Sequence, residues 1–168
     1  MKISNDTRNV LKNFSTINSG IRVKAGNKVE TISNMKNILA VATVDESFPQ
    51  DFSIYNLPEF LGATSLLSDP EFTFGDASLT VADDNSSLAY FYASEGMVTA
   101  PEKMITMPDA EINIDISSTL LSELQKAASV LGVNDLILSS DGTTIKLEVT
   151  DKKNPTSNTF SRIVGEGT

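Results

Sequence analysis

Apolar and polar positions along the chain follow one pattern three times. Each repeat has a stretch of helical spacing, opening near Ser4, Pro58 or Ser118, followed by three short strand-like runs. These runs are residues 21–24, 29–32 and 38–44, then 72–74, 79–82 and 88–93, then 136–139, 144–150 and 159–164. A unit that cannot bury its apolar face alone must stack on a copy of itself. If the units work in pairs, the chain holds one and a half domains.

Each helix is predicted from an apolar stripe at the spacing of a buried helix face. The stripes are Thr7, Val10, Leu11, Phe14 and Ile17, then Phe60, Leu61, Thr64 and Leu67, then Leu120, Leu121, Leu124, Ala127, Ala128 and Leu131. Ser4 can cap the first helix, and the stretch 18–20 is a typical helix stop. Arg8 and Lys12 are four residues apart and therefore point the same way, opposite the stripe.

Turn signals organise the strands and the domains. Gly26-Asn27 predicts a hairpin into residues 28–33, and Asp141-Gly142 predicts another between two alternating strands. Alternation lapses after Ser94, where a glycine and two prolines indicate an interdomain linker. We therefore expect a first domain at 1–94, a linker at 95–108 and the first half of a second domain at 109–168.

Composition excludes several classes of function. The 168-residue chain has a net charge of −9 and contains neither cysteine nor histidine. A hydrolase triad, a thiolate metal site and a structural zinc site are therefore not expected, and we predict no metal and no cofactor. Acidic residues such as Asp83, Asp84 and Asp135 lie in or beside predicted turns, where they are common for local reasons. No apolar run is long enough to cross a membrane, and no signal-peptide core follows Met1.

Two segments carry a resemblance to a known family. The first is Leu11-Lys12-Asn13-Phe14-Ser15-Thr16-Ile17-Asn18-Ser19-Gly20-Ile21. The second is Ile54-Tyr55-Asn56-Leu57, followed by Phe60-Leu61-Gly62 and Ser65-Leu66-Leu67. In order, spacing and position, both resemble the T-even-type bacteriophage sliding clamp. The match is specific over the first seventy residues or so, and beyond them the pattern of elements carries it.

The resemblance implies a fold, an assembly and a function. The fold is α+β, the DNA-clamp fold, with repeated helix-plus-antiparallel-strand units and the helices on one face of the sheets. A clamp subunit has two domains of two units each, and three subunits form a homotrimeric ring around duplex DNA. Such a ring tethers the DNA polymerase without catalysis, is placed on DNA by a clamp loader, and acts in the cytoplasm of the infected bacterium.

This chain departs from the family in length. It has three units where a complete subunit has four, so the resemblance implies that the last quarter is lacking. An engineered fragment, a degraded product and a shortened natural form all fit that shortfall.

The resemblance also assigns roles to residues. In a clamp the helices line the channel, so Lys2, Arg8, Lys12 and Lys126 are the candidates for facing DNA. The second helix carries only Glu59 as a charge between Pro58 and Leu67, so its part of the channel wall is expected to be neutral to acidic. For each basic residue, an ordinary solvated surface charge is the alternative.

The linker supplies the candidates for partner binding. Its four large apolar side chains are Met97, Met104, Ile105 and Met107. Methionine-rich surfaces suit adaptable binding, and in clamps this segment borders the region where polymerase and loader peptides dock. Covering the junction between domains is the alternative role. For the whole chain, the alternative function is a non-catalytic structural or binding module of a virus.

Overall fold

A computed structural model describes residues 1–94, 96–103, 108–109 and 114–166. The chain divides into two compact units, residues 1–105 and 106–168, and the division falls inside the predicted linker. The domain boundaries predicted from the sequence stay a prediction, and each unit is described by itself.

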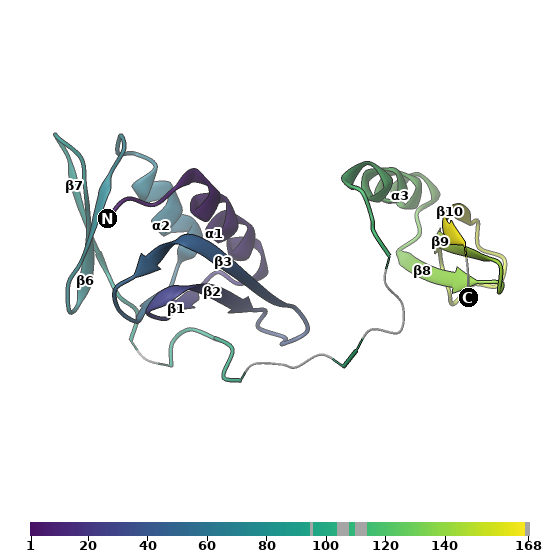
Figure 1. Cartoon of the computed structure of the whole chain (residues 1–168), viewed down its shortest axis with the longest axis horizontal. Helices are drawn as coiled ribbons and strands as arrows, with labels where there is room; N and C mark the ends of the chain where they lie inside the picture. The colour runs from purple at the N-terminus through teal and green to yellow at the C-terminus, as the bar shows by residue number, and fades with distance from the viewer. Residues whose placement is uncertain (95, 104–107, 110–113, 167–168) are drawn as a thin grey trace. The chain divides into compact units, whose positions relative to one another are not determined.

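The described residues of the first unit form two helices and seven strands (Figure 1). Its elements are α1 (Asn5–Ile17), β1 (Ile21–Val23), β2 (Gly26–Ile32), β3 (Leu39–Phe48), β4 (Phe52–Ile54), α2 (Leu57–Thr64), β5 (Glu71–Phe74), β6 (Ser78–Ala82) and β7 (Ser87–Phe91). The strands pair antiparallel as β1 with β4, β2 with β3, and β5 with β6 and β7. The two helices lie side by side, with α1 against β2 and β3 and α2 against β7 (Figure 1).

The two halves of the first unit repeat each other with an offset of fifty residues. The buried positions are Thr7, Leu11 and Phe14 in α1 and Leu57, Phe60 and Thr64 in α2. The halves join by strand pairing at two places. The strand after α1 pairs with the strand before α2, as β1 with β4. On the other side, the backbone of Met1, before α1, exchanges two hydrogen bonds of 2.7 Å with that of Phe72, after α2.

The core of the first unit joins both halves. Val29 and Val81, from equivalent strands of the two halves, are completely buried. In the same core, the rings of Phe48, Phe52 and Phe74 meet edge to face or tilted, with centroids 5.3–6.2 Å apart. Aromatic rings in such arrangements stabilise a core beyond the area they bury. Neither half therefore has a core of its own.

Local signals explain where α1 begins. The Ser4 hydroxyl accepts a hydrogen bond from the backbone N–H of Thr7 at 3.2 Å, as predicted for the cap. A second cap comes from β3, because the carboxylate of Glu46 accepts from the Ser4 N–H and from the buried Thr7 hydroxyl. Burial alone raises the pKa of Glu46, but these hydrogen bonds outweigh burial and hold the pKa below its ordinary value of 4.5.

One predicted hairpin of the first unit is wrong. Gly26-Asn27 does not turn β1 into β2, because β1 pairs with β4 and β2 pairs with β3. Gly26 instead opens β2 opposite Phe48, with φ at 112° and a shift of register before Lys28. The left-handed backbone that suits glycine in a turn here serves a bulge in a strand.

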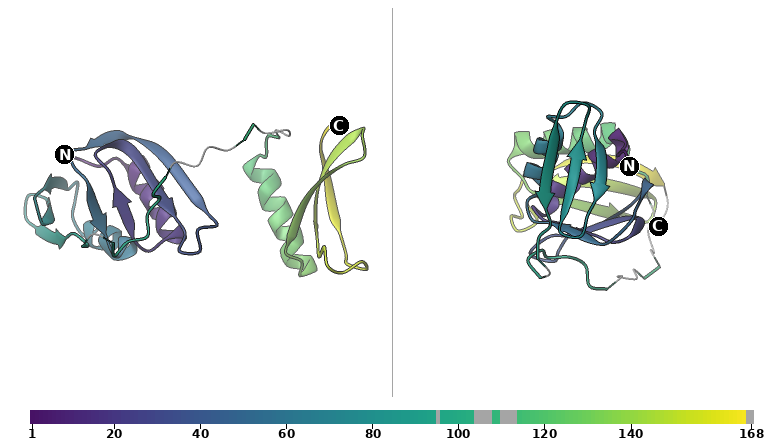
Figure 2. Two further views of the ribbon diagram at one scale, coloured as in Figure 1. Left: turned by 90° about the horizontal axis from the view of Figure 1, so that it is seen from below. Right: turned by 90° about the vertical axis from the view of Figure 1, so that its left-hand side faces the viewer.

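Where the structure describes it, the second unit is one helix on one three-stranded sheet (Figure 2). Its elements are α3 (Ser118–Leu131), β8 (Asp135–Ser140), β9 (Thr144–Thr150) and β10 (Phe160–Glu166). Leu124 of α3 packs with Leu147 and Val149 of β9 in a small core. Gly132, with φ at 67°, ends the helix. Leu121, an apolar position of the same helix, is 42% exposed.

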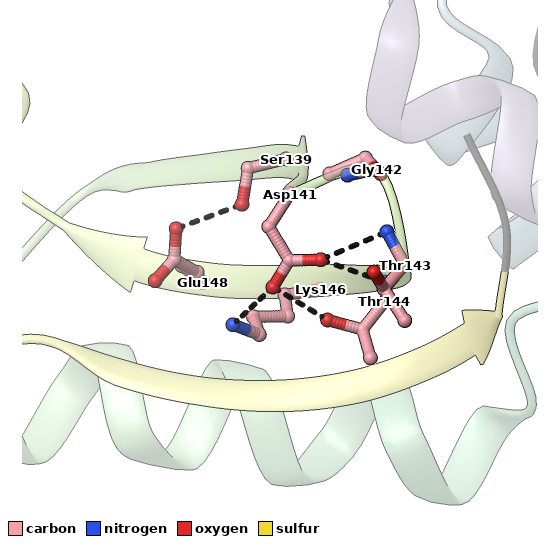
Figure 3. Close-up of polar contacts among 8 residues, drawn as sticks. Ser139, Asp141, Gly142, Thr143, Thr144, Lys146 and Glu148 are labelled. Carbon is pink, nitrogen blue, oxygen red and sulfur yellow. Dashed lines mark hydrogen bonds and ion pairs between the residues drawn. The ribbon is translucent and has the colours of Figure 1, made fainter.

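The hairpin predicted at Asp141-Gly142 is confirmed, joining β8 to β9 (Figure 3). Gly142 has φ at 86°. The Asp141 carboxylate accepts from the backbone N–H groups of Thr143 and Thr144 at 3.0 and 2.8 Å, and it also binds Lys146. These bonds favour the ionised form and lower the pKa of Asp141.

Replacing Glu46 by alanine tests the second cap of α1. The change leaves the Ser4 N–H and the buried Thr7 hydroxyl without their carboxylate, and we expect it to lower the free energy of unfolding by about 1–2 kcal/mol. Urea titration followed by circular dichroism at pH 7 measures it. Because the folded pKa is depressed, the contribution of Glu46 is present above pH 4.5 and is lost as the pH falls through the folded pKa.

The neighbouring Asp45→Ala variant is the matched control, since Asp45 is an exposed acid on the same strand. It should change the free energy of unfolding little, both at pH 7 and below pH 4.5. Equal losses in the two variants would contradict a specific role for Glu46.

Candidate nucleic-acid interface

A groove of about 430 Å³ runs between α1 and α2. The fifty-residue repeat supplies both walls, since Arg8, Lys12 and Ser15 lie on one wall and their equivalents Pro58, Gly62 and Ser65 on the other. Asn9, Leu61 and Thr64 complete the lining. The structure thus brings together two of the four basic residues predicted from the sequence.

The basic wall of the groove carries an unsatisfied donor. Arg8 is half-buried, and its Nε is buried without a hydrogen-bond partner among the described residues. A buried donor without an acceptor destabilises the protein by the full cost of its lost hydration. Lys12, one turn further, is exposed. The pair presents positive charge to an anionic ligand entering the groove.

The opposite wall is electrically neutral. Glu59, the acid in the first turn of α2, is absent from the groove lining. It accepts hydrogen bonds from the Tyr90 hydroxyl of β7 at 3.1 Å and from Asn56 at 3.3 Å. Burial first, then the hydrogen bond and negative charge of Glu59, raise the pKa of Tyr90 to about 12. Glu59 is thus paired with Tyr90 and Asn56 and does not line the groove.

The other two predicted basic residues lie elsewhere. The Lys2 ammonium pairs with Asp69 in the loop after α2, and this hydrogen bond is the main cause that raises the pKa of Lys2. Lys126 is exposed on α3 in the second unit, and no ion pair involves it within the described residues.

Of the predicted partner-binding residues, only Met97 can be placed. It is 58% exposed and borders a shallow depression of about 710 Å³ together with the exposed side chains of Tyr55 and Phe91. Met104, Ile105 and Met107 lie outside the described residues.

Sequence reasoning missed the side chain that anchors the linker. Asn18 is buried, and its amide donates to the carbonyls of Ile32 and Thr99 at 2.9 and 3.0 Å. The nearby Gly20 leaves room for Val98, whose side chain would lie 3.0 Å from an added Cβ. The sequence signal was an asparagine at a helix end, which is usually taken for a simple stop.

The described residues contain no helix long and apolar enough to span a bilayer. In the same part of the chain, no three His, Cys, Asp or Glu side chains gather to hold a metal ion. Acidic residues noted in the sequence have local roles instead, as when Asp83 accepts hydrogen bonds from the backbone of Ser68, Asn85 and Ser86.

Solved structures with the same architecture are bacterial sliding clamps. The beta clamp of Helicobacter pylori in complex with 3,4-difluorobenzamide superimposes with a TM-score of 0.63 at 19% identity, covering 98% of this chain and 51% of that one. The same clamp bound to a DNA ligase peptide gives 0.59 at 21% identity, covering 98% and 52%. These likenesses define the class of fold, the DNA clamp, and confirm the predicted fold class.

Sequence relatives define the family. The DNA polymerase processivity factor family model matches residues 4–100. The sliding clamp of Vibrio phage KVP40 is 36% identical over 172 residues, covering 99% of this chain and 78% of its own length. The sliding clamp of Enterobacteria phage T4 is 33% identical, covering 83% of this chain and 62% of its own length. The chain therefore belongs to the DNA polymerase processivity factor family, and its resemblance to the phage sliding clamps is confirmed.

The Glu59→Gln variant tests whether Tyr90 faces that acid. Removing the negative charge should move the ionisation of Tyr90 to a pH below its present value of about 12. The ultraviolet difference titration between each protein and its Tyr90→Phe counterpart isolates this step. An unchanged step would mean that Glu59 does not contact Tyr90 in solution.

Proposed function

We propose that this chain serves as the DNA-facing and polymerase-tethering part of a phage sliding clamp, acting without catalysis. The observation that carries the proposal is the helix-side groove, in which Arg8 and Lys12 have no acidic neighbour on the opposite wall. As in the family, the full-length protein would close a homotrimeric ring around duplex DNA in the cytoplasm of the infected host. A clamp loader would place the ring on its template.

The charges of the groove suit a ring that slides. Each phosphate contact made by a lysine or arginine adds affinity and salt dependence. Here α1 offers two such side chains, whereas the α2 wall contributes none. DNA that is held mainly by a closed ring needs few attractive contacts to its phosphates. The net charge of −9 over the whole chain favours repulsion of DNA from the remaining surface.

In this proposal Lys126 attracts DNA more strongly than Lys2 does. Lys126 is exposed on α3, where an equivalent helix face would continue the channel wall. Lys2 is paired with Asp69, so its charge is partly compensated before DNA arrives. We therefore assign the larger share of DNA attraction to Arg8, Lys12 and Lys126.

The surface around Met97 is the proposed site for partner peptides. It combines three exposed apolar side chains, those of Met97, Tyr55 and Phe91. Exposed apolar clusters of this kind often mark interaction sites. The bacterial beta clamp described above binds a DNA ligase peptide, and a peptide of the replicative polymerase or of the clamp loader would be the corresponding ligand here. Met104, Ile105 and Met107 stay candidates for partner binding from the sequence alone.

Neutralising the groove tests the DNA-facing role. In the Arg8→Gln, Lys12→Gln double variant, the slope of log affinity for duplex DNA against log salt should fall by about 0.9 for each phosphate that the protein no longer neutralises. Fluorescence anisotropy with a labelled duplex over a salt series measures the slope. The Lys152→Gln, Lys153→Gln variant is the control, since it removes equal charge from a loop between β9 and β10.

The control variant should keep the slope of the parent protein. Equal reductions of slope in the two variants would mean that DNA responds to net charge alone, which contradicts a DNA-facing groove. No stimulation of polymerase by the parent protein under any condition would favour a structural viral module instead.

A Met97→Asp variant separates partner binding from DNA binding. A charge in the apolar cluster should weaken docking of the polymerase peptide and shorten primer-extension products, while the affinity for duplex DNA stays that of the parent protein. Primer extension with the polymerase and clamp loader of the same phage, run beside the anisotropy assay, measures both effects. Products of unchanged length would contradict a role for Met97 in polymerase docking.

A further inference from the structure

Met97 lies on a short segment that is attached to the rest of the first unit on both sides. Before it, the backbone N–H of Ala93 donates a hydrogen bond to the carbonyl of Ser53 at 2.8 Å. After it, the carbonyl of Thr99 accepts a hydrogen bond from the side-chain amide of Asn18 at 3.0 Å. Attachment on both sides restricts the conformations that the backbone around Met97 can adopt.

The backbone of Asn18 does not explain why an asparagine stands at the end of α1. Asparagine or glycine after a helix usually supplies a left-handed backbone, as Gly132 does after α3 with φ at 67°. Asn18 instead has φ at −146° and ψ at 132°, which is extended backbone that most residues adopt. What distinguishes asparagine at this position is therefore its side chain.

The buried amide of Asn18 uses both of its N–H groups and its oxygen. The N–H groups donate to the carbonyls of Ile32 and Thr99 at 2.9 and 3.0 Å, and the oxygen accepts from the Gly20 N–H at 3.0 Å. Because a carbonyl only accepts hydrogen bonds, the amide nitrogen must face Ile32 and Thr99. A side chain without two donors would leave a carbonyl there unpaired.

A close apolar contact holds the residue before Thr99. A Cβ added at Gly20 would lie 3.0 and 3.2 Å from the Cγ1 and Cγ2 atoms of Val98, closer than side chains normally approach. Only the absence of a side chain at Gly20 lets Val98 lie there. The contact and the Asn18 hydrogen bond thus act on adjacent residues, one and two positions after Met97.

We propose that Asn18 is a positioning residue for partner docking. Asn18 is 6% exposed, so it acts through the segment 98–99, which holds Met97 where a partner peptide meets it. The inference rests on the proposed function of the surface around Met97. A site whose backbone is ordered before binding loses less conformational entropy when the ligand arrives, and it therefore binds more tightly.

The Asn18→Asp variant removes the two donors and little else. A carboxylate keeps the shape of the amide and an acceptor for the Gly20 N–H, but it cannot donate to the carbonyls of Ile32 and Thr99. We expect the affinity for the replicative polymerase of the same phage to fall about 3- to 10-fold, and the affinity for duplex DNA to stay that of the parent chain. Biolayer interferometry with immobilised polymerase and fluorescence anisotropy with a labelled duplex measure the two affinities.

The Asn13→Asp variant is the matched control. It makes the same chemical change in the same helix, at a position where the side chain is exposed. It should bind the polymerase as the parent chain does.

Nuclear magnetic resonance separates positioning from a general loss of structure. In the parent chain, the methyl groups of Val98 should show strong nuclear Overhauser effects to the α-protons of Gly20. Asn18→Asp should weaken them. The effects between the rings of Phe60 and Tyr90, whose centroids lie 5.1 Å apart in the same unit, should persist.

A second pair of variants displaces the same segment and leaves Asn18 in place. In Gly20→Ala the new methyl group pushes Val98 away, so the polymerase affinity should fall as in Asn18→Asp. Adding Val98→Ala removes the two atoms that clash and should restore most of the affinity. The carbonyl of Ile54, 3.3 Å from the new methyl group, is present in both variants, so a general effect of the alanine would not be reversed.

Three results would overturn the inference alone, provided that Met97→Asp still weakens polymerase binding. These are Asn18→Asp binding the polymerase like Asn13→Asp, the Phe60–Tyr90 and Val98–Gly20 effects weakening together, and Gly20→Ala staying weak after Val98→Ala. A parent chain that does not bind the polymerase would instead overturn the proposed docking function, and the inference with it.

Discussion

The pairing of two equivalent halves is the constraint on which the first unit depends. One helix and its strands leave an apolar face open, and only a second half placed against it can bury that face. The pairing of β1 with β4 brings Ile21 and Val23 beside the second half, where both are buried. The same arrangement sets α1 against α2 and so creates the groove that holds Arg8 and Lys12. Core and candidate site are consequences of one packing event.

The second unit shows what happens when that constraint is not met. Its helix and sheet form, because caps, turn residues and apolar spacing act over a few residues, as in the hairpin around Asp141 (Figure 3). Its core remains small, and Leu136 on the helix side of the sheet stays half exposed. Secondary structure is thus a local property of this repeat, whereas burial is a property of the pair.

This division also explains what was predictable from the sequence. The start of α1 at Ser4 and the common direction of Arg8 and Lys12 depend only on residues within one or two helical turns. Both features can therefore be predicted from the local sequence. The bulge at Gly26 was misread because its partner strand, β3, lies further along the chain. Likewise, the hydrogen bond that Glu59 accepts from Tyr90 joins residues 31 positions apart. Spacing along one element carries no information on such contacts.

Asn18 joins three segments through one side chain: the end of α1, the end of β2 and the linker at Thr99. The attachment is short and buried, so it is stiff. A pull exerted on the linker is therefore delivered to the base of α1 rather than absorbed by slack in the chain. Any displacement of the backbone at Thr99 therefore reaches, through one amide, the helix that carries Arg8 and Lys12.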